Sequence, residues 1–463
     1  MELTFHLERD KPLTPAGRLF LQPEMSQIIN CIIGIKYPVD VDAIRSELSK
    51  SLMIKHPRFS SILVRDLHGR EHWRKTQVDV ERHIVVLDEP VADNEDAVND
   101  YVADLSVSSP LPADKPLWEL HLLRAHNCVV FRLHHALGDG ISLMSMLLQC
   151  CRSAEDPDRL PNMASVGGGN GGDRRLRGLS GLWRVAKMAW LTAVFLVEFV
   201  LRTLWLSDRR TAVSGGEGVE LWPRKIATAK FRLDDMKAVK KTVADATIND
   251  VIFGVISCGL SRYLDLRSPK DLQEGQQITC MAMVNLRKSP GLKDLSKLME
   301  GDPGTRWGNR FGLFLFPVYY QGSKVDPLQH LKRAKAMIDQ KKQSLEAHFS
   351  YKLGDFAMSC FGPKMAARLN YRVVCNTTFT FSNVVGPGEE IIMAGNPVTY
   401  IRVSTSSLPH AITMHMVSYA GRADMQILVA KDIIPDPEVL AKCFEDALLE
   451  MKEAAKAATG KMK

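Results

Sequence analysis

The segment from residue 128 to residue 150 limits the folds open to this chain more than any other. A run of mostly apolar residues, Cys128 to Leu133, leads into the histidine pair His134-His135. The turn Gly138-Asp139-Gly140 follows, and then an apolar, helix-like run to Cys150. This order predicts a strand, a tight loop and a helix. Because a side chain at the end of such a strand is held rigidly and faces a cleft lined by loops, the pattern indicates an active site in an α/β fold.

The loop letters HHALGDG match the HHxxxDG signature of the CoA-dependent acyltransferases, the superfamily of chloramphenicol acetyltransferase, the plant BAHD enzymes and peptide-synthetase condensation domains. Other stretches resemble more closely the plant-type bifunctional wax ester synthase/diacylglycerol acyltransferases. They are the proline-rich opening at 12–18, the PLW stretch at 116–118, the ND pair at 249–250, the GN pair at 308–309 and the SNVVGP run at 382–387. The resemblance covers most of the chain.

Length predicts more than one domain, since 463 residues exceed what one hydrophobic core usually serves. We expect an N-terminal subdomain over 1–160, a linker over 161–220 and a C-terminal subdomain over 221–463. Gly167 to Gly172 forms the flexible centre of the linker and lacks the Lys-Ser/Thr that a phosphate loop requires. The resemblance implies that both subdomains are α/β units of the chloramphenicol acetyltransferase type, with mixed sheets and a tunnel between them.

Hydrophobic periodicity and turn residues predict strands and helices in both halves. In the first half we expect strands at 28–36, 61–65, 83–87, 117–123 and 128–133, and helices at 41–55 and 95–106. In the second half we expect strands at 226–231, 279–284, 313–318, 377–384, 393–403, 411–419 and 424–430, and helices at 233–243, 251–264, 327–345 and 437–457.

Composition narrows the class of protein. Hydrophobic residues make up 45% and charged residues 24%, which is typical of a globular chain. Nine cysteines without CxxC spacing favour reduced thiols in a protein facing the cytosol, with neither a zinc site nor a disulfide framework. The first ten residues lack the apolar run of a cleaved signal peptide. A net charge of +7 suits an anionic ligand or an anionic membrane surface, and no nucleic-acid partner is expected.

The most apolar segment is 182–206, which contains three tryptophans and follows the basic cluster Arg174, Arg175 and Arg177. Its uninterrupted apolar core between Lys187 and Glu198 is shorter than the roughly 20 residues that cross a bilayer. At about 100° per residue, its charged residues fall on one narrow stripe, at Arg184, Lys187, Glu198 and Arg202. These features favour a helix lying in a membrane interface over a spanning helix or a core helix. We expect the endoplasmic reticulum membrane, with the catalytic part facing the cytosol, or the plasma membrane.

The histidine motif predicts the chemistry. A thioester is already activated, so attack by an alcohol requires chiefly a base for the hydroxyl proton and donors for the oxyanion. The resemblance implies that His135 is the base, and the position of His135 next to the loop agrees with this role. A neutral imidazole suits that role at cytosolic pH. His134 should face the other side of the strand and support it, while Gly138 and Gly140 allow the tight turn. Without a GxSxG elbow, no covalent acyl-enzyme is expected, and no cofactor or metal, since acyl-CoA is a substrate.

The resemblance implies further site residues. In the superfamily an arginine at the end of a strand pairs with the motif aspartate, so Arg287 is expected to pair with Asp139, because a buried carboxylate needs such a partner. Ser382 and Asn383 lie in the stretch beside the active-site channel, either as donors to an oxyanion or substrate carbonyl or as an ordinary strand end.

Three other residues belong to matching stretches: Asn249, Asp250 and Trp118. They are candidates for the substrate site. Helix capping by Thr247 and Asp250 explains the first two equally well, and a core position explains Trp118.

The activity implied by the resemblance is transfer of a long-chain acyl group from acyl-CoA to a fatty alcohol, to diacylglycerol, or to both. Two alternatives stay open. One is a soluble acyltransferase of the BAHD type acting on a small or phenolic alcohol, against which the lack of a DFGWG stretch near the carboxyl end argues. The other is a non-enzymatic lipid-binding membrane protein that has kept the fold.

Overall fold

The computed structural model describes residues 10–91, 96–162, 179–268, 273–287, 307–322 and 325–460. The linker centre at 167–172 and the arginines at 174, 175 and 177 lie outside these ranges. The elements of the first half are β1 (Lys11–Pro12), α1 (Pro15–Leu19), the 3-10 helix η1 (Pro23–Met25), β2 (Ile28–Ile35), α2 (Val41–Lys50), α3 (Leu52–Lys55), β3 (Ser61–Arg65), β4 (Glu71–Lys75), β5 (Ile84–Leu87), α4 (Ala97–Ser108), β6 (Trp118–Leu123), β7 (Cys128–His134), α5 (Gly140–Gln149) and β8 (Cys151–Ser153).

The elements of the second half are α6 (Leu179–Leu204), β9 (Arg224–Arg232), α7 (Leu233–Lys240), α8 (Ile248–Arg267), β10 (Gln277–Asn285), β11 (Phe311–Tyr319), α10 (Pro327–Lys342), α11 (Glu346–Cys375), β12 (Phe379–Val385), β13 (Ile391–Met393), β14 (Asn396–Thr405), β15 (Ile412–Tyr419), β16 (Arg422–Ala430) and α12 (Pro437–Gly460). Helix α11, strand β4 and the short elements β1, α1, β8 and β13 were not predicted from the sequence. The remaining expected strands and helices are present, with ends that shift by a few residues and with the helix expected at 41–55 divided at Ser51.

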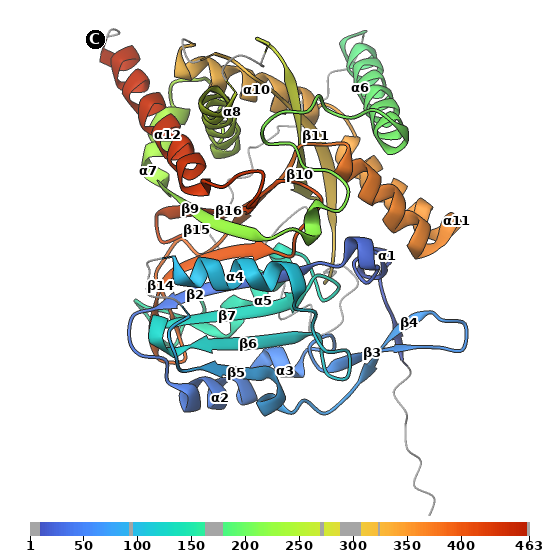
Figure 1. Cartoon of the computed structure of the whole chain (residues 1–463), viewed down its shortest axis with the longest axis vertical. Coiled ribbons are helices and arrows are strands. Elements are labelled where there is room, and N and C mark those ends of the chain that lie inside the picture. Colours follow the sequence, from blue (N-terminus) through green and yellow to red (C-terminus); the bar gives the residue numbers. More distant parts are fainter. Residues whose placement is uncertain are drawn as a thin grey trace, which may run out of the picture.

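Two large sheets, which form the two halves of the body, lie one above the other in Figure 1. The lower sheet has seven strands in the order β5-β6-β7-β2-β14-β13-β8, and the upper sheet has six in the order β11-β10-β12-β15-β16-β9. Each contains both parallel and antiparallel pairs, such as β5 with β6 and β6 with β7. The predicted α/β fold with mixed sheets in two subdomains is confirmed.

Strands β13 and β14 come late in the chain, yet they belong to the first sheet. Strand β14 pairs antiparallel with β2, with Ile401 opposite Ile33. Since β2 would otherwise expose an unpaired edge, β14 completes the sheet. Residues 391–405 were expected to belong to the C-terminal subdomain, but they pair with strands of the first half. The domain boundary expected at residue 221 therefore does not separate the two sheets.

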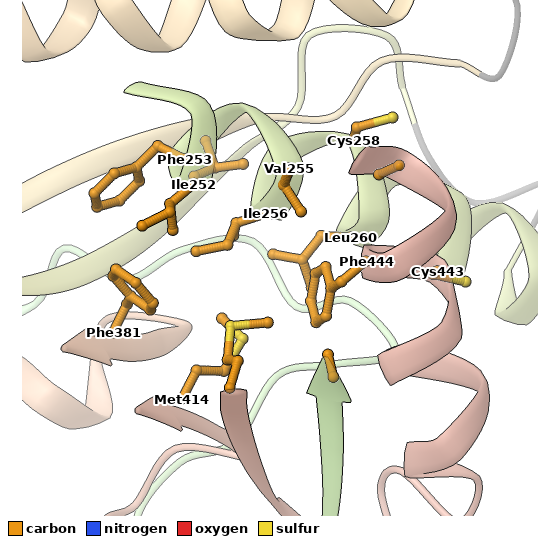
Figure 2. Close-up of a cluster of buried hydrophobic side chains, with 14 of the residues drawn as sticks. Ile252, Phe253, Val255, Ile256, Cys258, Leu260, Phe381, Met414, Cys443 and Phe444 are labelled. Atoms are coloured by element: carbon orange, nitrogen blue, oxygen red, sulfur yellow. The ribbon is translucent and has the colours of Figure 1, made fainter. Parts of the chain in front are cut away.

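The core of the second half lies between α8 and the six-stranded sheet. Figure 2 shows Ile252, Phe253 and Ile256 of α8 pointing toward Phe381 and Met414, which come from β12 and β15. The rings of Phe253 and Phe381 pack edge to face with centroids 5.4 Å apart, an arrangement that aromatic pairs favour.

Helix α12 packs beside α8, and both helices share a core with the six-stranded sheet. At Gly259 a Cβ atom would come within 2.3 Å of the Phe444 ring, so glycine permits the close approach of these two helices. The start of α8 is fixed by the predicted capping box, in which Thr247 accepts from the Asp250 amide and the Asp250 carboxylate accepts from the Thr247 amide.

Helix α6 packs beside α11 at one edge of the molecule (Figure 1). The predicted charged stripe does not lie in solvent along its whole length. Arg202 is buried and pairs with Glu198 and Asp208, each at 3.0 Å, because a buried guanidinium requires compensating acceptors. Within the described ranges, no helix combines the length and apolar character required to cross a membrane.

Candidate active site

A cavity of about 230 Å³ lies between the two large sheets. Its lining is mostly apolar and comes from both halves of the chain, from β2, β7 and α5 on one side and from β10, β12 and α11 on the other. His135 lies in this lining, directly after the last residue of β7. The strand, loop and helix predicted around the histidine motif thus place His135 in the wall of a cavity whose apolar lining suits a long hydrocarbon chain.

The imidazole of His135 is oriented by Asn309. Its Nδ1 lies 3.0 Å from Asn309 Oδ1, and Asn309 Nδ2 donates to the His135 main-chain carbonyl at 2.8 Å. An amide oxygen only accepts hydrogen bonds, so Nδ1 carries the proton and Nε2 is left as the basic nitrogen. This is the tautomer that a general base requires.

Aromatic rings enclose the same imidazole. Phe20 stacks on it with ring centroids 4.1 Å apart, and Phe311 lies at 6.0 Å. Burial lowers the pKa of His135 below its ordinary value of 6.5, and the negative charge of Asp139 only partly opposes that effect. The imidazole is therefore neutral, and available as a base, at cytosolic pH.

His134 points to the opposite face of β7, as alternation along a strand requires. Its Nδ1 accepts a hydrogen bond from the Ala136 amide at 3.1 Å. Burial lowers the pKa of His134 to about 4, so the ring stays neutral and keeps that acceptor. This histidine holds the turn and does not line the cavity.

Asp139 is saturated with hydrogen bonds. One carboxylate oxygen caps α5 by accepting from the Ser142 amide at 3.0 Å, and the other accepts from Arg287 Nη1 at 2.6 Å and from the Arg310 amide at 2.9 Å. Arg287 also donates to Gly308 O and, at 3.2 Å, to Ser142 Oγ. The expected ion pair thus exists, and it joins the histidine loop to the second half of the chain.

The glycines of the motif allow close packing against the second half. A Cβ atom on Gly140 would lie 2.9 Å from a methyl group of Val384, and one on Gly138 would lie 3.4 Å from the Trp307 indole nitrogen. That nitrogen donates to the Leu137 carbonyl at 2.6 Å. The loop is therefore clamped between its own helix and the segment around Trp307.

Ser382 and Asn383 line the cavity from β12. Asn383 Nδ2 donates to Asn249 Oδ1 at 3.0 Å, so the structure brings together three of the predicted site residues. The Ser382 hydroxyl is free to offer a hydrogen bond to a bound molecule near His135.

Of the residues predicted for the substrate site, Asn249, Asp250 and Trp118 do not line the cavity, and Asn249 contacts it only through Asn383. Asp250 is fully buried, and its carboxylate closes the capping box with Thr247. Trp118 is also fully buried, where it donates to the Phe59 carbonyl at 2.9 Å and stacks on His83 at 3.8 Å. Helix capping accounts for the position of Asp250, and core packing accounts for that of Trp118.

Sequence reasoning assigned no role to several residues that shape the site: Phe20, Asn309, Phe311 and His415. His415 lines the cavity from β15, where it stands opposite Ser382. Its buried Nδ1 has no hydrogen-bond partner among the residues that the structure describes, and burial lowers the pKa of His415 to about 4. The GN pair at 308–309 was noticed, but a separation of 174 residues hides its contact with His135.

Comparison with known proteins decides the family. The family model named wax ester synthase/diacylglycerol acyltransferase catalytic domain matches residues 28–252, and the model of the WS/DGAT C-terminal domain matches residues 307–452. Wax ester synthase/diacylglycerol acyltransferase 6 of Arabidopsis thaliana is 36% identical to the chain over 490 residues, which cover 97% of this chain and 94% of the relative. The chain belongs to the wax ester synthase/diacylglycerol acyltransferase family. The resemblance noted in its motifs is confirmed.

Other members and solved structures agree. Wax ester synthase/diacylglycerol acyltransferase 11 of Arabidopsis thaliana is 36% identical over 466 residues, covering 96% of this chain and 95% of the relative. The solved wax ester synthase/diacylglycerol acyltransferase from Marinobacter aquaeolei is 17% identical and superposes with a TM-score of 0.61 over 96% of this chain and all of that one. The first condensation domain of the CDA synthetase gives a TM-score of 0.56 at 13% identity, over 96% of this chain and 99% of that one. These solved structures share the fold.

Proposed function

We propose that this family member transfers a long-chain acyl group from acyl-CoA to a fatty alcohol, to diacylglycerol, or to both. The observation that carries the proposal is the apolar cavity between the two halves with His135 in its lining. Long hydrocarbon chains fit such a lining, whereas a small phenolic acceptor would leave most of it unused.

The reaction follows from the orientation of His135. Its Nε2 removes the proton from the acceptor hydroxyl while the hydroxyl oxygen attacks the thioester carbonyl. The tetrahedral intermediate collapses, the carbon–sulfur bond breaks, and the CoA thiolate takes the proton back from Nε2. Ser382 is the candidate donor to the oxyanion. The chain forms no covalent bond to the acyl group and needs no cofactor or metal.

The membrane surface is the proposed location of the acceptor. Helices α6 and α11 pack against each other, and both expose large apolar side chains, among them Trp183, Trp190, Phe356 and Phe361. Exposed basic residues accompany them, at Arg184, Lys187, Lys352, Lys364 and Arg368. Aromatic and basic side chains together suit the headgroup region of a bilayer. Because α11 also contributes Asn370 and Val374 to the cavity, a lipid acceptor has a short route from the bilayer to His135.

The cytosolic face of the endoplasmic reticulum, or the plasma membrane, is the proposed site of action. All nine cysteines are free thiols, which suits a reducing compartment. Fractionation of cells that express a tagged chain tests this location.

The activity is tested with labelled palmitoyl-CoA, offered with hexadecanol and separately with dioleoylglycerol, using membranes that contain the protein. We expect the wild type to form ester and His135→Ala to form none above background. The ratio of the two products names the preferred acceptor. Binding of the thioester without formation of either ester would overturn the proposal and leave a lipid-binding protein.

A further inference from the structure

A second cavity, of about 390 Å³, lies beneath α5 in the first half of the chain. Its wall is largely apolar and includes Ile33, Ile44, Leu48, Met53, Leu120 and Met146. None of the motif residues faces it, and neither the family match nor the proposed reaction assigns it a role. Two residues, Phe131 and Leu147, line both this cavity and the active-site cavity.

The two cavities lie end to end along one face of the seven-stranded sheet. On β2, Ile29 and Cys31 line the active-site cavity, and Ile33, the next residue on the same face, lines the second one. Opposite Cys31 stands Phe131, whose other neighbour across the sheet, Leu120, belongs to the second cavity. The passage from one cavity to the other therefore crosses the ring of Phe131.

Helix α5 shows the same order from the other side. Leu143 and Met144 line the active-site cavity, Met146 and Cys150 line the second one, and Leu147 between them lines both. Phe131 and Leu147 thus form a partition, with Phe131 contributed by the sheet and Leu147 by the helix. Phe131 precedes His135 by four residues, which is roughly 13 Å along an extended strand. A long acyl chain is longer than this distance, so its end would reach beyond Phe131.

We infer that the second cavity receives the distal end of a long acyl chain of acyl-CoA, and that Phe131 and Leu147 set the chain length at which this extension begins. The inference rests on the proposed function. The opposite end of the active-site cavity, lined by Leu313, Val374 and Leu408, lies against α11 and so serves the acceptor that arrives from the bilayer. One hydrocarbon chain then extends to either side of His135.

Part of the wall of the second cavity is charged. Glu47, Lys50, Arg152 and Asp158 contribute to it, and a hydrocarbon end gains nothing from desolvating such groups. The charged part of the wall therefore limits how far the chain extends. The site fits an unbranched chain of limited length, with no polar group at its end.

The test uses two substitutions with opposite effects. Leu48→Trp fills the second cavity, and Phe131→Ala opens the partition. With hexadecanol held constant, kcat/KM is measured for octadecanoyl-CoA and for decanoyl-CoA, and with decanoyl-CoA held constant it is measured for decanol and octadecanol. We expect Leu48→Trp to lower the octadecanoyl-to-decanoyl ratio by about tenfold and Phe131→Ala to raise it, with the alcohol ratio unchanged in both. The matched control is Leu67→Trp, at a fully exposed position outside both cavities.

Two results would overturn the inference. In the first, both variants have the unfolding temperature of the wild type and also its octadecanoyl-to-decanoyl ratio. In the second, the ratio for the two alcohols changes and the ratio for the two acyl-CoA substrates does not. Phe131→Leu, a milder change, supplies the same readout should Phe131→Ala fail to fold. Ester formation by wild type with unaltered ratios in the variants would remove only the second cavity from the mechanism. Absence of ester formation by wild type would instead remove the proposed function.

Discussion

Asn309 holds His135 through two hydrogen bonds, one to the ring and one to the main chain. The ring contact, at 3.0 Å, selects the tautomer, and the main-chain contact, at 2.8 Å, fixes the amide so that its oxygen faces the ring. The general base and the residue that orients it therefore come from opposite halves of the chain.

Replacing Asn309 with Ala should lower kcat about a hundredfold, because the imidazole loses the acceptor that fixes its tautomer. The KM for acyl-CoA should change little. Asn309→Asp should raise the pKa of His135, since a carboxylate stabilises the imidazolium, and should move the acid limb of the pH–kcat profile to higher pH. Asn396→Ala, on the exposed turn near Tyr37, is the control. An unchanged kcat in Asn309→Ala would refute the orienting role.

The ion pair between Asp139 and Arg287 should contribute to stability more than a surface pair does. Both side chains are largely buried, with 8% and 15% of their surface exposed. A double-mutant cycle with Asp139→Asn and Arg287→Gln should give a coupling free energy of about 1–3 kcal/mol in chemical unfolding. The exposed pair Arg124–Asp88 should give less than about 1 kcal/mol in the same cycle. Equal couplings would contradict the structural role assigned to Asp139.

Gly140→Ala should impair the enzyme for a steric reason, because the added methyl group would meet Val384 at 2.9 Å. We expect a loss of stability of about 1–3 kcal/mol and a fall in kcat as the histidine loop shifts. The double variant Gly140→Ala/Val384→Ala should recover much of both, since the second change removes the colliding methyl group. Failure of this rescue, measured by thermal unfolding and by ester formation, would show that another contact demands glycine.

Acid should destabilise the protein through His134. In the folded state the pKa of His134 is about 4, against about 6.5 in the unfolded chain. Between these values the unfolded state binds more protons, so the free energy of unfolding falls as pH decreases from about 6.5 to about 4, by up to about 1.4 kcal/mol per pH unit for this group. His134→Gln, which does not titrate, should flatten that slope in urea unfolding. The slope of a His68→Gln control, at an exposed position, should match wild type.

Binding to lipid vesicles should depend on the exposed face of α6. Trp183 and Trp190 have 72% and 68% of their surface exposed, so replacing both with Glu removes interfacial anchors without disturbing the core. We expect at least about a tenfold loss of affinity for anionic vesicles in flotation assays. Leu67→Glu, in the exposed loop between β3 and β4, should bind as wild type does. Vesicle binding that survives the double substitution would place the contact elsewhere.

Local patterns were sufficient to predict most of the fold and the centre of the site. The alternation and turn residues around His135 predicted strand β7, the loop and α5, and the family resemblance supplied the pairing of Asp139 with Arg287. Side chains alternate between the two faces of a strand, and this alternation predicted that His134 and His135 face opposite sides.

Long-range contacts and irregular helices were not predictable in the same way. Helix α11 contains Gly354, Gly362 and Pro363, and at Gly362, where φ is +76°, the backbone leaves helical geometry, so the element is two helical segments joined by a kink. Glycine and proline are poor helix formers, so residue preferences gave no signal for helices on either side of this kink. The stripe that ends at Arg202 was interpreted as the narrow charged side of a membrane-interface helix. The burial of Arg202 was not foreseen, because its partner Asp208 approaches it only once the chain folds back. Trp118 occurs in a motif shared with the family but packs on His83, which no local pattern connects with it.

The position of strand β14 in the first sheet delays the completion of that sheet during protein synthesis. The pairing of β14 with β2 joins residues from the beginning and the end of the chain, so a ribosome must release residue 405 before the first sheet is complete. Until then, β2 presents a long apolar edge that is open to pairing with other chains. We expect newly made N-terminal fragments to require chaperones and to resist expression alone, although they carry the whole histidine motif.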